Sequence, residues 1–516
     1  MIPFDASGAF HPVAQGGELR RLAVRGAAAT ISGAALSLGV QVVSTVVLAR
    51  LLAPADFGVV AMVTTISMLL MSFGTSGFSE AVIQPKDVNQ FQASNLFWIT
   101  CAIGFILTLG FALSGSLLAR FYRNPLVTLV TVVISASIFI SALSTVHIAL
   151  LRRAMRFSAV AANDVIARAV NTAVAVILAL KGWGYWALVA GIVAQVLFAT
   201  VGACWLCRWI PNLPRRGVGT RSMLRFAANV YGRFSANYFA RNFDNVLVGW
   251  RFNAGALGYY KKAYDLFALS ASQLTVPLHN VALAALSRLN HDRALFKRYL
   301  TNSLGVVAFV GMAVGADLTL VGRDLVRLVL GPNWSESGRI FELFGPGIGV
   351  MLLSSTVGWI HLSIGKPERW LRWTLVETGI IALSFIVALR WGPAGIAVAW
   401  SLSYWILFIP AFWYAGRPID LGIWSLIGPI WRYAAASLVA GLGTAAVARS
   451  TIFWGAPADL QIALEAIVIN SALFVALYLG TVVLLHRGFA PMQQLARLLR
   501  ELAPSRNIGR AAAEPV

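Results

Sequence analysis

The chain has 516 residues, of which 58% are hydrophobic and only 12% are charged. A soluble globular protein is about half apolar, whereas here apolar stretches recur along nearly the whole length and the mean hydropathy is +0.75. This composition excludes a soluble globular protein and indicates a protein that crosses a membrane many times.

The net charge of +21 could indicate a nucleic-acid partner in a soluble protein. Successive membrane spans, however, put every second connecting segment on the same side of the membrane, and most of the Lys and Arg residues fall in the segments of one side. The positive-inside rule assigns that side to the cytoplasm. The basic charge therefore reflects topology, with both termini in the cytoplasm, and we expect no nucleic-acid partner.

A transmembrane helix needs about 20 predominantly apolar residues. Stretches of that length predict an all-α polytopic protein with fourteen membrane-spanning helices. In chain order the predicted helices cover residues 27–49, 58–80, 94–118, 125–150, 159–180, 184–207, 225–250, 263–288, 299–321, 340–364, 371–391, 393–416, 427–449 and 461–486.

Two segments separated by 200 positions are similar, namely Val47–Gly58 after the first helix and Leu247–Gly258 after the seventh. Many transporters are built from such internal repeats, so we expect two six-helix lobes followed by two extra helices. The predicted parts are a cytoplasmic N-terminal segment (1–25), an N-lobe (26–207), a basic cytoplasmic linker (208–224), a C-lobe (225–417), helices thirteen and fourteen (418–486), and a cytoplasmic tail with an interfacial helix (487–516).

The predicted helix 225–250 is unusually polar, and its polar residues share one face at 100° per residue. Intramembrane charges usually face a bundle interior or a water-filled cavity. Arginine forms bidentate hydrogen bonds with phosphate groups. We therefore predict that a diphosphate binds to Arg241 and Arg233 of this helix and to Arg168 of helix five. In the structural alternative, Arg233 extends to the cytoplasmic interface and Arg241 pairs with Asp244 or Asp164.

Other polar residues of the predicted helices are candidates for the same cavity or for binding a coupling ion such as H⁺ or Na⁺. The candidates for hydrogen bonds in the cavity are Asn237, Tyr238, Asn245, Gln41 and Asn171, and the candidates for ion coupling are Asp164, Asp244 and Glu377.

No cofactor or metal site is expected. Cys204 and Cys207 have a C-x-x-C spacing, but without a second Cys or His pair this is more typical of helix packing than of a metal site. The segment Val326–Trp334 is predicted to be a short amphipathic stretch on the outer membrane surface that caps the cavity.

Three motifs resemble those of the Wzx-type flippases for polysaccharide repeat units, which belong to the multidrug/oligosaccharidyl-lipid/polysaccharide exporter superfamily. The branch that the chain resembles exports colanic acid and other exopolysaccharides. The motifs are Leu48-Ala-Arg-Leu-Leu-Ala-Pro-Ala-Asp-Phe-Gly58, Gly258-Tyr-Tyr-Lys-Lys-Ala-Tyr-Asp265 and Leu330-Gly-Pro-Asn-Trp334.

This resemblance, which covers about residues 20–490, implies a bacterial inner-membrane protein. It would move an undecaprenyl-diphosphate-linked oligosaccharide from the cytoplasmic to the periplasmic leaflet by alternating access, for exopolysaccharide, capsule or lipopolysaccharide synthesis. The implied partners are this glycan, membrane lipid and a polysaccharide polymerase.

Two other functions stay open at this point. A cation-coupled drug exporter or a lipid II flippase of the same superfamily would share the fold. A membrane-embedded polymerase or glycosyltransferase would need catalytic residues on a substantial external loop, and no predicted loop is longer than about 20 residues. Because the sequence also lacks a phosphate-binding loop, a zinc-protease motif and a nucleophile elbow, we expect a transporter and not an enzyme.

Overall fold

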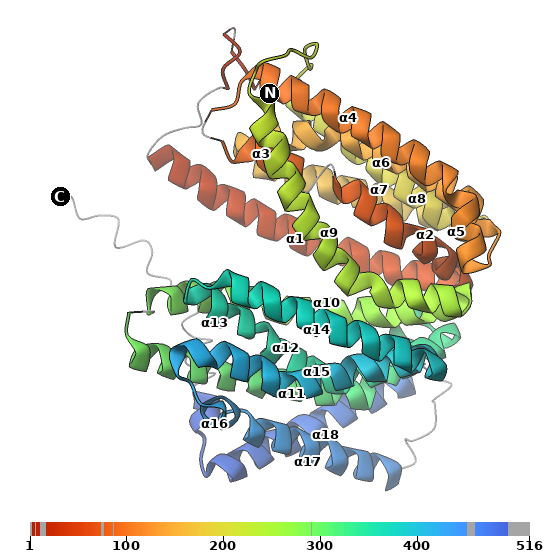
Figure 1. Cartoon of the computed structure of the whole chain (residues 1–516). Helices are drawn as coiled ribbons and strands as arrows, with labels where there is room; N and C mark the ends of the chain where they lie inside the picture. The colour runs from red at the N-terminus through yellow and green to blue at the C-terminus, as the bar shows by residue number, and fades with distance from the viewer. Residues whose placement is uncertain are drawn as a thin grey trace. The chain divides into compact units, whose positions relative to one another are not determined.

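The structure is a computed structural model, and it describes residues 3–5, 7–10, 17–73, 77–85, 87–289, 291–450 and 460–493. In this part of the chain nearly all regular structure is helical, with extended structure confined to two isolated bridges, Phe4 to Phe10 and Ala9 to Asn89. Figure 1 shows the helices in chain order. The predicted all-α polytopic class is confirmed.

Fourteen helices of the described residues have 20 or more residues, and each overlaps one predicted span. They are α1 (Gly17–Leu51), α2 (Pro54–Phe73), α4 (Gln90–Leu113), α6 (Leu126–Arg153), α7 (Phe157–Leu180), α8 (Tyr185–Cys207), α9 (Thr220–Arg251), α10 (Ala254–Arg288), α11 (Arg293–Leu330), α12 (Ser335–Ser355), α14 (Pro367–Ala388), α15 (Gly392–Gly416), α17 (Trp431–Ser450) and α18 (Leu460–His486).

Shorter helices follow or join these long ones: α3 (Ser79–Ile83), α5 (Gly115–Tyr122), α13 (Val357–Ser363), α16 (Ile423–Ile427) and the 3₁₀ turns η2 (Pro332–Trp334), η3 (Leu389–Trp391) and η4 (Arg417–Ile419). Ten stretches of the described residues are both long and apolar enough to cross a membrane, and one of them, Pro367–Ile419, holds both α14 and α15. Helix α9 is not among the ten, in keeping with its polar face.

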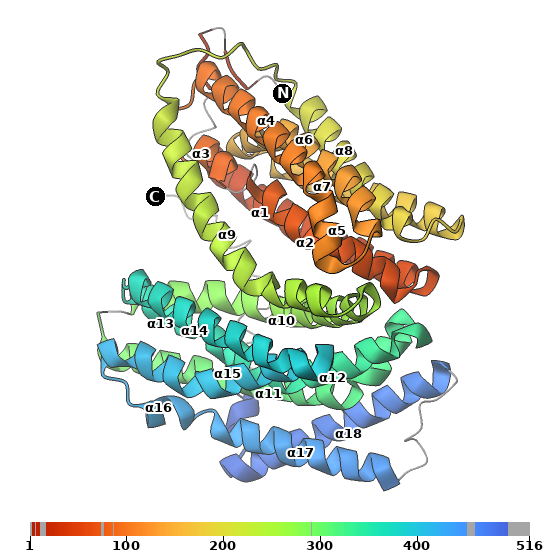
Figure 2. The same ribbon diagram turned by 45° about the vertical axis from the view of Figure 1, so that its right-hand side comes forward.

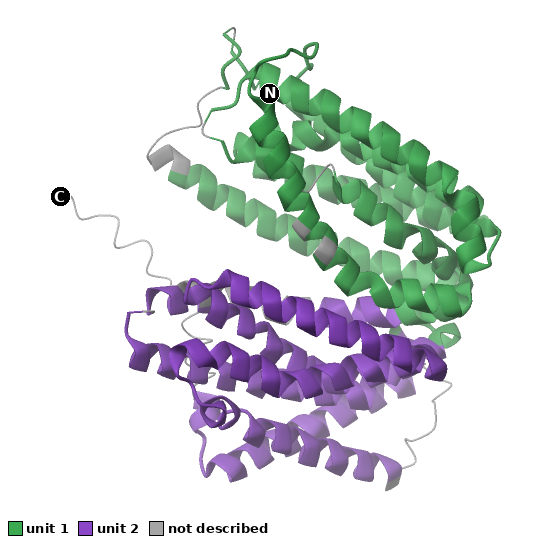
Figure 3. Ribbon diagram, viewed as in Figure 1, with its two compact units in different colours: residues 1–261, 329–334 green, residues 262–328, 335–516 purple. Residues whose placement is uncertain are grey.

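The helices form two compact units, coloured separately in Figure 3. Unit 1 contains Met1–Lys261 and Val329–Trp334, and unit 2 contains Lys262–Leu328 and Ser335–Val516. Unit 1 thus holds the predicted N-lobe and linker together with α9 and the first turns of α10. The two units are defined by which residues contact one another, whereas the predicted lobes are consecutive stretches of the chain. The two divisions are therefore not equivalent, and the lobe boundaries stay a prediction.

Helix α6 is the centre of unit 1 and packs against α2, α4 and α8. At one end of this core, Phe4 is 5% exposed and its ring lies 6.1 Å from that of Trp209. The predicted linker is fixed here, because the Asn95 side chain of α4 donates to the Arg215 carbonyl (2.7 Å) and accepts from the Arg215 N–H (2.9 Å). The linker is therefore attached to unit 1 by specific hydrogen bonds.

Unit 2 is built on close helix packing through small residues, which is common in membrane proteins. A Cβ at Gly315 of α11 would lie 2.9 Å from the Gly345 carbonyl oxygen of α12, and Ser401 of α15 donates to the Leu343 carbonyl at 2.7 Å. Helices α17 and α18 pack against each other and lie side by side in both views (Figures 1 and 2).

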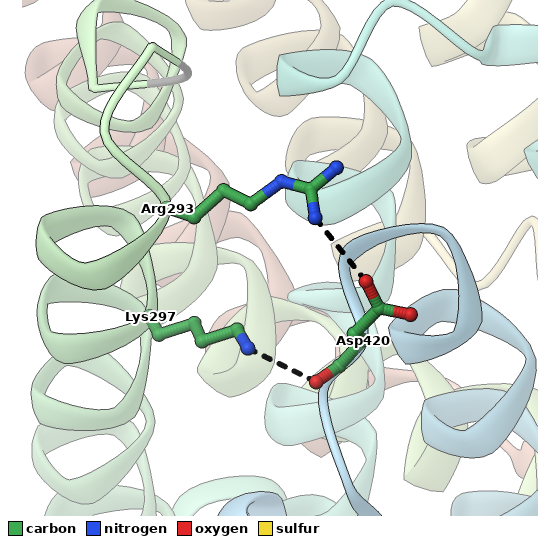
Figure 4. A network of polar contacts seen from close by, with 3 residues as sticks. All are labelled: Arg293, Lys297 and Asp420. Atoms are coloured by element: carbon green, nitrogen blue, oxygen red, sulfur yellow. Dashed lines mark hydrogen bonds and ion pairs between the residues drawn. The ribbon is translucent and has the colours of Figure 1, made fainter.

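A polar contact joins the start of α11 to the turn that follows η4 (Figure 4). Arg293 Nη1 lies 3.2 Å from Asp420 Oδ2, and Lys297 Nζ donates to the Asp420 carbonyl at 3.0 Å. Since the Arg293 and Asp420 side chains are 72% and 77% exposed, the ion pair contributes at most about 1 kcal/mol. Of the tail with the predicted interfacial helix, residues from 494 onward lie outside the described residues.

Candidate functional site

Helix α9 is fastened to α2 by two tyrosines. Tyr231 Oη donates to the Leu69 carbonyl at 3.1 Å, and Tyr238 Oη donates to the Thr65 carbonyl at 2.8 Å. The tyrosines are seven residues apart, which brings them to the same side of the helix. Tyr238, predicted to face the cavity, thus uses its hydroxyl to position α9.

The predicted substrate-binding residues of α9 differ in their exposure and in whether their side chains are described. Asn237 and Arg241 are exposed. Arg241 forms no hydrogen bond or ion pair with any described residue. The side chain of Arg233 lies outside the described residues, although its backbone belongs to α9. Arg241 therefore presents an exposed guanidinium group at the polar face of α9, with no ion-pair partner among the described residues.

Asp244 does not pair with Arg241, although the structural alternative allowed it. Its side chain is buried, with Oδ2 accepting from Tyr260 Oη at 2.7 Å and Oδ1 accepting from the Asn245 N–H at 2.8 Å. Lys261 is close enough to interact with it electrostatically. Asn245 is buried as well and contacts Asn242 at 3.4 Å. Asp244 and Asn245 thus hold the end of α9 against the start of α10, and roles for them in ion coupling or substrate binding stay predictions.

A second polar group lies between α1 and α7 of unit 1, and these two helices pack along each other. Arg168 Nη1 donates to Gln41 Oε1 at 3.4 Å. Asp164 is exposed and forms no ion pair with the described residues, but Arg152 and Arg168 interact with it electrostatically. The structure thus brings Gln41, Asp164 and Arg168 together.

Two predicted site residues are placed elsewhere. Asn171 Nδ2 donates to Gln195 Oε1 of α8 at 2.6 Å, so it links two neighbouring helices. Glu377 belongs to α14 of unit 2, where it is half-buried and accepts a hydrogen bond from Trp373. A small hollow between α2, α4 and α6 is lined by apolar and neutral side chains, including Leu70, Phe73 and Thr100, and is unsuited to an anion.

The three motifs that carry the family resemblance converge at one end of unit 1, which sequence reasoning did not foresee. A Cβ at Gly58 of α2 would overlap the carbonyl oxygen of Ala254, the first residue of α10. Reciprocally, a Cβ at Gly258 of α10 would overlap the carbonyl oxygen of Pro54, the first residue of α2. Each residue of one pair is 200 positions from its counterpart in the other. The first turns of α2 and α10 therefore cross with direct backbone contact and near two-fold symmetry.

Trp334, from the third motif, fills the space beside this crossing. Its side chain is 0% exposed, its indole N–H donates to the Ala49 carbonyl at 2.7 Å, and its ring lies 5.3 Å from Phe57 and 6.1 Å from Tyr259. The predicted surface location of Val326–Trp334 is wrong. Helix α11 continues to Leu330, and Gly331 at φ +100 turns the chain so that Trp334 enters the core of unit 1.

A family model described as polysaccharide biosynthesis protein matches residues 47–339, which is more than half of the chain. The chain belongs to this family. The matched region includes the crossing of α2 and α10, the polar face of α9 and Trp334. The family resemblance carried by the motifs is thus confirmed at this level.

Curated relatives are similar in sequence over most of the chain. The succinoglycan biosynthesis transport protein ExoT of Rhizobium meliloti (strain 1021) is 22% identical over 381 residues, which cover 72% of this chain and 77% of that protein. The lipopolysaccharide biosynthesis protein WzxC of Escherichia coli (strain K12) is 19% identical over 421 residues, covering 79% and 85%.

Solved structures of transporters share the fold. The lipid II flippase MurJ in an inward closed conformation superimposes with a TM-score of 0.68 at 15% identity, covering 90% of this chain and 99% of that one. An inward-facing multidrug resistance transporter of the MATE family gives a TM-score of 0.61 at 12% identity, covering 74% and 94%. This member of the polysaccharide biosynthesis family is therefore a multi-pass membrane protein with a transporter fold, as expected for a protein that is not an enzyme.

Proposed function

We propose that the protein is a flippase that moves an undecaprenyl-diphosphate-linked oligosaccharide from the cytoplasmic to the periplasmic leaflet of a bacterial inner membrane, with both termini cytoplasmic. It works by alternating access, driven by an H⁺ or Na⁺ gradient, in the synthesis of an exopolysaccharide, capsule or lipopolysaccharide. Membership of the polysaccharide biosynthesis family supports this proposal, and so does the similarity to ExoT, a transport protein by name.

The observation that carries the proposal is the exposed Arg241, which pairs with none of the residues that the structure describes. A cation on a helix of membrane-spanning length is costly unless it faces water or an anion. Asp244, the nearest carboxylate along α9, is occupied by Tyr260 and Asn245. Arg241 is thus free to bind an anionic group, and the guanidinium fork suits the oxygens of a diphosphate. Arg168, which is held by Gln41, supplies a second guanidinium within unit 1.

The similarity to MurJ favours one second candidate, a lipid II flippase. Both substrates join a diphosphate to a polyprenyl chain, so Arg241 would serve either. We favour the polysaccharide substrate, in the exopolysaccharide-exporting branch, because the family model and the relatives ExoT and WzxC carry polysaccharide names. Flipping of each lipid in the same proteoliposomes would separate the two functions.

Arg241→Ala and Arg168→Ala are each expected to reduce flipping of an undecaprenyl-diphosphate-linked oligosaccharide by about 10- to 100-fold. Each removes a charged hydrogen bond worth about 1.5–3 kcal/mol. The rate is measured in proteoliposomes containing a fluorescently labelled substrate. Arg241→Lys keeps the charge but loses the bidentate fork, so its rate should lie between those of the wild type and Arg241→Ala.

Arg120→Ala, which removes an arginine outside the polar faces of α1, α7 and α9, serves as the control and should flip normally. If both Arg241→Ala and Arg168→Ala supported wild-type flipping at normal protein levels, the diphosphate assignment would be wrong. If Arg241→Ala loses flipping but binds a phosphate-free glycan as the wild type does, the lost interaction is the one between Arg241 and the diphosphate.

A further inference from the structure

Asp317 is a carboxylate inside the membrane-spanning part of unit 2 that the sequence reasoning did not single out. It belongs to α11, within the candidate span Arg293–Leu330, and the predicted span 299–321 also includes it. Its side chain is half-buried. An ionisable residue at such a position is a candidate functional group because its charge is costly in the membrane.

The surroundings of Asp317 leave that charge without compensation. Oδ2 accepts one hydrogen bond, from Ser471 Oγ of α18 at 3.3 Å. Oδ1 is buried and has no hydrogen-bond partner among the described residues. No cation of the described chain interacts with the carboxylate. The other ionisable residues of its own helix and of α12, α17 and α18 are Arg293, Lys297, Arg298, Tyr299, Arg323, Asp324, Arg327, Glu336, Arg339, Glu342, Arg432, Tyr433, Arg449, Glu465, Tyr478 and His486.

Asp244 of α9 and Asp324 of α11 have partners that Asp317 lacks. Asp244 has Tyr260, the Asn245 N–H and Lys261. Asp324, two turns further along α11, lies near Arg323 and Arg327. An anion with a single hydroxyl partner is unstable in a low-dielectric region. The site therefore favours a ligand that removes the negative charge.

We propose that Asp317 and Ser471 form a proton-binding site inside the membrane, at the contact between α11 and α18. A proton converts the carboxylate into a neutral acid, which can donate as well as accept a hydrogen bond. A dehydrated metal cation such as Ca²⁺ requires about six to eight oxygen ligands. The two carboxylate oxygens and one hydroxyl at this site are too few for such an ion.

The position of the site gives the proton a structural effect. Helix α18 has a second link to α11, in which Tyr478 Oη donates to the Phe309 carbonyl at 2.7 Å. That link does not involve a carboxylate, so proton binding changes only the link at Asp317. Since α17 packs on α18, the proton controls how firmly the α17–α18 pair is held to α11. Coupling of this change to substrate transport rests on the proposed flippase function.

Proton binding can be measured without any transport. Infrared spectra of the purified protein in lipid nanodiscs, recorded across a pH series, report the carbonyl band of protonated carboxyl groups. We expect a band at neutral pH that is lost in Asp317→Asn, shifted in Ser471→Ala, and retained in Glu465→Gln, which removes an exposed carboxylate of α18. An Asp317→Asn spectrum identical to that of the wild type at neutral pH would overturn the site.

Transport assays then test the coupling separately. In proteoliposomes with an imposed pH gradient, the wild type should flip a labelled undecaprenyl-diphosphate-linked oligosaccharide faster than without the gradient. In Asp317→Asn the ratio of the rates with and without the gradient should fall by about fivefold or more. If the wild type flips no substrate, the proposed function fails while the infrared result still decides the proton site. If Asp317→Asn responds to the gradient like the wild type, the coupling is refuted.

Discussion

Gly58→Ala is expected to lower the transport rate by about tenfold or more and to destabilise the protein by about 1–3 kcal/mol, the usual cost of overpacking. The new Cβ would overlap the Ala254 carbonyl oxygen. That atom belongs to the backbone and cannot rotate away, so the first turns of α2 and α10 must separate. Flipping in proteoliposomes and thermal unfolding in detergent measure the two effects.

The matched control is Gly110→Ala in α4, where an added Cβ meets no atom within 4 Å. This substitution should leave transport unchanged and stabilise the helix slightly, because Ala has the higher helix propensity. Gly258→Ala should reproduce the Gly58→Ala effect from the other side of the crossing, at the Pro54 carbonyl. A Gly58→Ala protein that melts and transports like Gly110→Ala would show that the crossing is not closely packed.

Trp334→Ala is expected to cost about 3–5 kcal/mol of unfolding free energy, as for other fully buried aromatic residues. The substitution would leave a cavity and remove the ring contacts with Phe57 and Tyr259 and the hydrogen bond to the Ala49 carbonyl. Trp334→Phe keeps most of the ring but loses the N–H donor, so its loss should be about 1 kcal/mol. Thermal unfolding of purified protein gives the order of the two variants.

The control for Trp334 is Trp424→Ala, because Trp424 is 80% exposed and fills no cavity of the described protein. Its melting temperature should match that of the wild type. Equal melting temperatures for Trp334→Ala and Trp424→Ala would contradict the insertion of Trp334 into unit 1. A stable Trp334→Ala protein with reduced flipping would instead assign Trp334 to the transport cycle alone.

The helices could be predicted because one physical requirement, about 20 apolar residues to cross the bilayer, fixes both their number and their position. Even the polar α9 was recognised, since its polar residues share one face while the rest is apolar. The breaks at Ser114, between α4 and α5, and at Thr356, between α12 and α13, were not predicted. Hydropathy reports how long an apolar stretch is, and a local change of helix geometry does not alter it.

The candidate site was harder to predict, because helical periodicity shows which residues share a face but not which neighbour that face meets. Asn171 was predicted to face the cavity, and the structure directs it to Gln195 of α8. Arg168 and Gln41 were named independently, and only the packing of α1 on α7 brings them together. Whether these residues bind substrate stays a prediction.

The residues that sequence reasoning missed lack a local signal. Asp317 has no charged residue one turn before or after it on α11, and its partner Ser471 is 154 positions away. Trp334 was assigned to the membrane surface because the short segment Val326–Trp334 was interpreted as amphipathic. The Gly331-Pro-Asn sequence before Trp334 has the residue types that favour a turn, and it could have indicated that the chain changes direction there.

The reciprocal contact of Gly58 and Gly258 has a thermodynamic consequence. Both glycines permit the same close approach, that of the α2 backbone to the α10 backbone. Once one alanine has forced these backbones apart, the second meets less resistance. The free-energy costs of the two substitutions should therefore not be additive, as is common for residues in direct contact. A double-mutant cycle at two positions far apart in the chain would then report one shared structural element.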